Sequence, residues 1–134
     1  MISRPANAAE AVAQGAQLLD EKDPGWWRKI NLETLVLSNS EACICGQLGR
    51  TREQSYHSYI AHVLGLTEGY LDGDRETALA ACCGFDALPN RITPMRWTWI
   101  TTFPQLHCEW EEVINARLAA DTLAPVEEKE LVTA

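Results

Sequence analysis

The stretch Asn39-Ser-Glu-Ala-Cys-Ile-Cys-Gly-Gln-Leu-Gly49 is the most informative part of this chain for its fold. It places two cysteines, one residue apart, between a helix-capping signal and two glycines. Residues two apart on a helix point about 200° away from each other, so Cys43 and Cys45 do not share a helical face. We expect a brief helix over residues 41–45 that ends at Gly46 or Gly49. Each thiol should fill a small apolar gap, because cysteine is among the most buried residue types.

A metal site is the alternative interpretation of the same cysteines. Four side chains would supply a zinc-compatible set of ligands if the fold brought them together: Cys43, Cys45, His107 and Cys108. The C-x-C spacing differs from the C-x2–4-C spacing of known zinc motifs, and the other ligands come from a distant segment. The sequence therefore predicts no cofactor, with a small structural or regulatory domain holding zinc or iron as the alternative.

Length and composition indicate one soluble domain. The chain has 134 residues, of which 46% are hydrophobic and 22% charged. These values are ordinary for a globular protein of this size. We expect a single helical domain over residues 1–122, followed by an acidic, flexible tail over residues 123–134 that begins close to Pro125.

Charge and cysteine usage exclude several classes of partner. The net charge of −8 argues against direct nucleic-acid binding, which needs clustered Lys and Arg to meet phosphates. No apolar run approaches the ~20 residues that cross a bilayer, so no membrane partner is expected. The N-terminus does not resemble a signal peptide. Five cysteines, with Cys82 and Cys83 adjacent, indicate reduced thiols and a cytoplasmic location.

Apolar periodicity predicts a mainly α protein, a compact bundle of four or five helices. The helices are expected over 6–20, over 52–64 after a capping box at Thr51–Gln54, over 75–83, and from Pro104 to about Ala120. Gly65 should end the second of these helices. The shared core should contain the residues on their apolar faces: Leu19, Ile60, Val63, Trp110 and Val113.

Two segments have patterns that are less decisive. Residues 30–37 fit either a short helical turn or a strand, and the lack of a nearby hairpin partner favours the turn. Residues 88–94 are expected to form a loop. From Met95 to Phe103 large apolar residues alternate with other residues, which favours extended structure and one small β element near residues 95–101.

Five tryptophans are many for this length. Trp26 and Trp27 follow a turn at Pro24-Gly25, where consecutive side chains diverge and cannot easily enter one core. We expect at least one of the two indoles to stay partly exposed, rimmed by Arg28 and Lys29, and to bind a protein partner. Packing against the first helix is the alternative. The binding hypothesis loses its support if four tryptophans are all buried: Trp26, Trp27, Trp97 and Trp99.

The order of several short motifs resembles a set of small proteins encoded by actinobacteria and their phages. The resemblance covers most of residues 15–118 and rests on Gly15-Ala-Gln-Leu-Leu-Asp-Glu21, Pro24-Gly-Trp26, Ile30-Asn-Leu32, Leu35, Leu37-Ser38, Cys43-Ile-Cys-Gly-Gln-Leu-Gly49, Leu64-Gly-Leu66, Gly84-Phe-Asp86 and Trp110-Glu-Glu-Val-Ile114. The family pattern usually carries a large aliphatic residue before the glycine that Gly46 matches, and this chain departs from it there. The resemblance implies one domain and a phage or prophage setting, but no mechanism, because the set has no established activity.

No catalytic motif is present in the sequence. Gly46-Gln-Leu-Gly49 lacks the Lys-Ser/Thr ending of a phosphate-binding loop, and no local signature joins the three histidines to the thiols. We therefore expect a non-enzymatic accessory protein that binds a host or phage protein. The sequence does not determine its oligomeric state.

Overall fold

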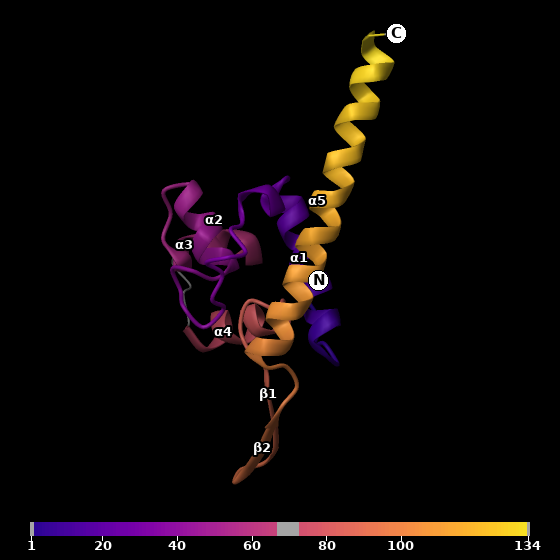
Figure 1. Cartoon of the computed structure of the whole chain (residues 1–134). Coiled ribbons are helices and arrows are strands. Elements are labelled where there is room, and N and C mark those ends of the chain that lie inside the picture. Colours follow the sequence, from indigo (N-terminus) through magenta and orange to yellow (C-terminus); the bar gives the residue numbers. More distant parts are fainter. Residues whose placement is uncertain (1, 67–72, 134) are drawn as a thin grey trace.

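The computed structural model describes residues 2–66 and 73–133, leaving aside the side chains of residues 73–76, 91 and 122–133. Within these residues the protein is mainly α-helical, with one small β-hairpin (Figure 1). The elements in chain order are α1 (Ala8–Lys22), the 3₁₀ turn η1 (Trp26–Lys29), α2 (Ile44–Thr51), α3 (Tyr56–Leu64), α4 (Gly73–Cys82), β1 (Pro89–Thr93), β2 (Arg96–Trp99) and α5 (Phe103–Thr133). This architecture confirms the predicted fold class.

The first helix begins and ends close to its predicted limits. The side chain of Asn7 accepts a hydrogen bond from the backbone N–H of Glu10, 2.9 Å away, and the Glu10 carboxylate accepts one from the N–H of Ala6. These reciprocal bonds satisfy donors that the first turn of a helix leaves unpaired. The helix then buries its stripe of small residues, including Val12, Ala16 and Leu19, as the periodicity predicted.

The central stretch folds differently from the prediction. The helix does not cover residues 41–45 but begins at Ile44, and it runs through both glycines to Thr51. Cys43 is its N-cap, with Sγ accepting a hydrogen bond from the N–H of Gly46 at 3.3 Å. Gly46 is required by packing, because a Cβ atom there would lie 2.2 Å from the carbonyl oxygen of Ser40.

The capping box at Thr51–Gln54 is also wrong as a prediction. Thr51 is the last residue of α2, and its hydroxyl donates to the carbonyl of Leu48. The cap of α3 is Ser55, whose Oγ accepts a bond from the N–H of Ser58. The two helices are joined within a few residues, which leaves no room for a helix that begins at Arg52. The predicted stop is confirmed, because Gly65 adopts the left-handed conformation with a φ of 74°.

The hairpin corrects one loop and confirms one strand. Residues 89–93, expected to lie in a loop, form β1, which pairs antiparallel with β2 and has an irregularity between Arg91 and Thr93. The extended structure expected near residues 95–101 is present as β2. Residues 30–37 form turns, as favoured. Figure 1 shows the hairpin projecting from the helical body at the start of α5.

The last helix is longer than expected. It was predicted to end near Ala120, but α5 extends from Phe103 to Thr133 and includes the segment expected to be a flexible tail. Its first half packs on α1 and η1, and its second half runs past the body (Figure 1). No helix among the described residues is long and apolar enough to cross a membrane.

The core is centred on the indole of Trp110. Its ring stacks on Phe85 at a centroid distance of 5.6 Å and meets the edge of Trp26 at 5.6 Å. Its N–H donates to the carbonyl of Gly84 at 2.7 Å, so the buried polar atom is satisfied. The predicted core is confirmed, because Leu19, Ile60, Val63 and Trp110 are buried and Val113 packs against them.

Candidate functional site

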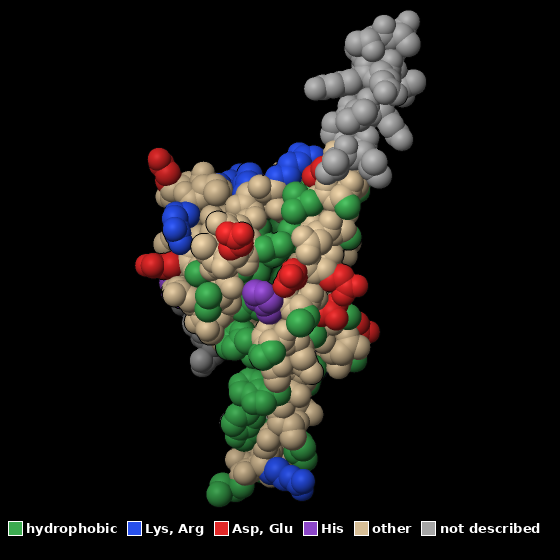
Figure 2. All heavy atoms as spheres, in the orientation of Figure 1, with side chains coloured by type: hydrophobic (Ala, Val, Ile, Leu, Met, Phe, Trp, Pro, Cys, Tyr) green, Lys and Arg blue, Asp and Glu red, His purple; other side chains and the backbone are tan. Residues whose placement is uncertain are grey.

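Most of the exposed large apolar side chains of the described residues are in the β-hairpin. Six such side chains are exposed, and four of them lie between residues 92 and 99: Ile92, Met95, Trp97 and Trp99. Met95 at the turn is 93% exposed, and the two tryptophans are 54% and 49% exposed. Figure 2 shows the hydrophobic side chains gathered along the projecting hairpin. Clustered apolar surface of this kind usually marks an interaction site.

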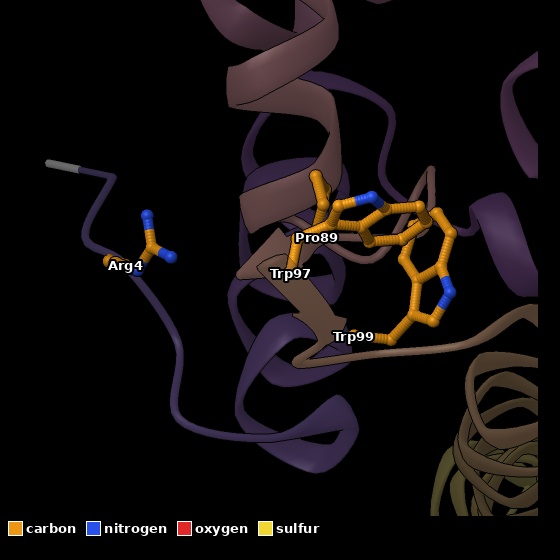
Figure 3. A pocket seen from close by; sticks show the side chains of 4 residues that line it. All are labelled: Arg4, Pro89, Trp97 and Trp99. Carbon is orange, nitrogen blue, oxygen red and sulfur yellow. The ribbon is translucent and has the colours of Figure 1, made fainter. Parts of the chain in front are cut away.

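The two exposed tryptophans form one aromatic surface. Trp97 and Trp99 are two residues apart on β2, so their side chains leave the same face of the strand. Their rings meet edge to face with centroids 4.9 Å apart. Pro89, which pairs with Trp99 across the hairpin, lies on the same face (Figure 3). We call Pro89, Trp97 and Trp99 the aromatic face.

The aromatic face borders a surface hollow. The hollow has a volume of about 480 Å³ and is lined by the aromatic face together with Arg4. Arg4 lies apart from the indoles (Figure 3), and its guanidinium is 3.4 Å from the side-chain oxygen of Asn90 on β1. This hollow has room for an apolar side chain of a partner beside the indoles.

The hairpin differs in charge from the rest of the protein. Residues 89–99 contain two arginines, Arg91 and Arg96, and no aspartate or glutamate, whereas the whole chain carries a net charge of −8. The side chain of Arg96 is exposed. The hairpin therefore favours a partner with negative charge.

The sequence predicted that at least one of Trp26 and Trp27 stays partly exposed, and that residue is Trp27, because Trp26 lies in the core. Its side chain is fully buried, and its indole N–H donates to Asp20 at 3.0 Å. The guanidinium of Arg117 on α5 lies 5.5 Å from its ring centroid and forms an ion pair with Asp20. The turn at Pro24-Gly25 thus directs this indole into the core, where it is unavailable to a partner.

Trp27 lies half-buried between η1 and α5. Its indole N–H donates to the carboxylate of Asp121, and Arg117 lies 5.0 Å from its ring centroid. Arg28 holds the same carboxylate through two hydrogen bonds of 2.8 and 2.9 Å. The hydrogen bonds from Arg28 and Trp27 lower the pKa of Asp121. Through these contacts Trp27 and Arg28 attach α5 to the rest of the domain.

A buried polar network connects the end of α1 with η1 and α3. Asp23 is buried at the end of α1 and accepts hydrogen bonds from the hydroxyl of Tyr59 and from Nζ of Lys29, both at 2.9 Å. Burial, reinforced by the Asp23 carboxylate, raises the pKa of Tyr59. Lys29, whose side chain stays 38% exposed, therefore binds the buried carboxylate of Asp23 from the surface of the protein.

The four candidate metal ligands are not brought together. Cys43 caps α2, and Cys45 is buried beside it in the core. His107 pairs with Glu111 one turn along α5, and the thiol of Cys108 is exposed. In the part of the chain that the structure describes, no group of three or more His, Cys, Asp or Glu side chains is placed to hold a metal ion. Burial raises the pKa of the Cys43 thiol, which disfavours the thiolate that binds metals.

Comparison with known proteins found no matching family model, no matching curated protein and no matching solved structure. The candidate site therefore rests on the geometry of this chain alone. The sequence contained one signal for it, the alternation of tryptophans at positions 97 and 99. That alternation indicated a strand with one apolar face, but the pattern does not distinguish a face that meets the core from one that meets solvent.

Proposed function

We propose that this protein is a non-enzymatic binding module that holds another protein through the aromatic face of its hairpin. The observation that carries the proposal is the exposure of Trp97 and Trp99, about half of each side chain, on a hairpin that projects from the body. The condition set by the sequence, that Trp26, Trp27, Trp97 and Trp99 are not all buried, is met, because Trp26 alone among these four is buried.

Aromatic side chains in this arrangement suit protein recognition. Tryptophan is enriched among the few residues that supply most of the energy of protein interfaces. It offers a large apolar area, and few of its bonds must be fixed on binding. Keeping both indoles in water costs solvation free energy that contact with a partner would recover. The proposed binding residues are therefore those of the hairpin and not Trp26 and Trp27, because α5 packs against η1, which contains these two tryptophans.

The class of partner follows from charge and from the resemblance described above. An overall charge of −8 disfavours nucleic acid, so a protein is the proposed partner. The resemblance to small proteins of actinobacteria and their phages suggests a host or phage protein. The absence of a catalytic motif from the sequence supports a binding role over an enzymatic one.

A pull-down with matched variants tests the proposal. Tagged wild-type protein, a Trp97→Ala/Trp99→Ala variant and a Val36→Ala variant are used as baits in an actinobacterial lysate, and captured proteins are identified by mass spectrometry. Val36 is 47% exposed and lies in the turn before α2, where its N–H donates to the carbonyl of Ala42, so its variant controls for loss of exposed apolar area outside the hairpin. Truncating a central interface tryptophan costs about 2 kcal/mol or more of binding free energy.

We expect wild type and Val36→Ala to retain the same specific partner and the double variant to lose it. The fold of all three baits is compared by far-UV circular dichroism, and the hairpin variant should keep the helical signal. Equal capture by all three baits, or capture of nothing by the wild type, would show that the aromatic face is not a protein-binding site.

A further inference from the structure

We infer that the outer edge of β2 accepts an extended, acidic segment of a partner protein as a third strand. This inference rests on the proposed function and specifies the partner. The sheet that the described residues form has only two strands, and all four side chains of β2 are exposed. A two-stranded hairpin without cover is marginally stable in water, whereas three strands are stable. An added strand would extend the sheet beyond β2 and place its own side chains beside the indoles of the aromatic face.

The ladder shows which backbone groups face outward. The N–H of Ile100 donates to the carbonyl of Leu88 at 2.8 Å, and the N–H of Leu88 donates to Oγ1 of Thr101, so Leu88 and Ile100 stand at a hydrogen-bonded position of the ladder. Such pairs alternate along an antiparallel ladder, which makes Asn90 and Thr98 the next one. The N–H and C=O groups of Trp97 and Trp99 therefore point away from β1. No backbone group of another described segment is bonded to them.

The two edges of the hairpin are not equivalent. Pro89 faces Trp99 at a position where the backbone nitrogen of β1 points outward, and proline has no N–H to donate. Proline on an edge strand hinders the addition of another strand. The outer edge of β2 has a donor at both Trp97 and Trp99. Strand addition is therefore directed to β2.

The side chains on the two faces of β2 define the chemistry of the added strand. Trp97 and Trp99 lie on one face, while Arg96 and Thr98 lie on the other. A complementary strand alternates apolar residues, which contact the indoles, with acidic residues on the side of Arg96. A second copy of this chain is disfavoured, because antiparallel pairing of β2 with β2 places both Arg96 side chains on the same face of the joined sheet, with no acidic residue in either hairpin to offset them.

The experiment uses a defined probe and two variants of Trp97, of which one keeps the backbone N–H and the other lacks it. The probe is a capped peptide of alternating glutamate and valine. Its controls are a version with lysine in place of glutamate and a version with N-methylated valines. The variants are Trp97→Val, which removes the indole but keeps the N–H, and Trp97→Pro, which removes both. The N–H of Trp97 faces away from β1, so proline there spares the ladder within the hairpin.

Amide hydrogen exchange measured by NMR and titration of the peptide give the outcomes. We expect the peptide to slow exchange at the Trp97 and Trp99 amides, the lysine version to bind about tenfold more weakly, and the N-methylated version not to bind. Trp97→Val should weaken binding, and Trp97→Pro should abolish it with the helical signal intact. Equal binding by the two variants, or no protection of these amides, would overturn the inference.

Two further results would show that the edge of β2 binds something other than an acidic strand. Protection that appears without peptide and rises with protein concentration would identify a second copy as the occupant. Binding to vesicles of anionic phospholipid, with no binding to the peptide, would identify a bilayer surface. Either result contradicts the added strand. If the double variant loses its captured partner but the peptide results fail, the proposed function stands and this inference does not.

Discussion

Replacing Gly46 with alanine sets two effects of opposite sign against each other. Gly46 lies in the first turn of α2, where alanine favours the helix by at most about 1 kcal/mol. A Cβ atom at this position would lie 2.2 Å from the carbonyl oxygen of Ser40 and 2.8 Å from the carbonyl carbons of Ser40 and Glu41. These neighbours are backbone atoms, so no flexible side chain can move aside. The overlap must shift the chain itself.

The balance of these terms predicts a loss of stability. Overpacking a close contact costs about 1–3 kcal/mol, and contact with backbone puts this site at the upper end. After subtraction of the gain in helix propensity, we expect Gly46→Ala to lower the free energy of unfolding by about 2 kcal/mol. For a domain of this length, that corresponds to a fall in Tm of about 8 °C.

Urea unfolding followed by circular dichroism measures the effect, with Gly65→Ala as the matched control. Gly65 has no atom within 4 Å of a Cβ position but has a φ of +74°. Its substitution therefore reports the cost of the left-handed backbone alone, about 1 kcal/mol. If Gly46→Ala is as stable as the wild type, or more stable, the close approach to Ser40 is not the reason for glycine at this position.

Three other measurements test the structure. Trp26→Ala should lower the free energy of unfolding by about 4 kcal/mol in urea, because it empties a buried site, and half-buried Trp27→Ala should cost less; equal losses would contradict the placement. Elemental analysis should find no stoichiometric zinc or iron, and Cys43→Ser should lower stability with metal content unchanged; one metal per chain, lost in the variant, would reverse this prediction. Burial raises the pKa of Cys83 from 9.0 to about 12, so the folded state keeps a proton that the unfolded chain releases. Unfolding free energy should then fall above pH 9 by about 1.4 kcal/mol per pH unit for each such group, less steeply in Cys83→Ala; constant stability from about pH 8 to 11 would refute it.

The sequence by itself determined the features that depend on local patterns. Apolar spacing at helical period located α1, α3 and the first half of α5, with the buried side chains Leu19, Val63 and Trp110 among them. The alternation from Met95 to Phe103 located β2. Gly65 marked the end of α3, because only glycine readily adopts the left-handed conformation found there. These signals depend on residues a few positions apart.

Between α2 and α3, which are joined by only a few residues, two local sequence signals indicated different starts for the second helix. Thr51 and Ser55 both have the chemistry of a helix cap, and the capping box favoured Thr51. The actual cap is Ser55, because α2 continues through Gly46 and Gly49 to Thr51. The two glycines looked like helix stops, although they stand inside the helix to admit neighbouring backbone. A sequence pattern records the small residue but not the atom that approaches it.

The tertiary structure alone decided which tryptophans are buried and where the candidate site lies. Trp27 bonds with Asp121 across 94 residues, and Trp110 bonds with Gly84 across 26. Such contacts form only when separate helices meet, so no local pattern encodes them. Trp26 and Trp97 are equally apolar in the sequence. One is covered because α5 passes over it, and the other is exposed because its hairpin projects beyond every described helix.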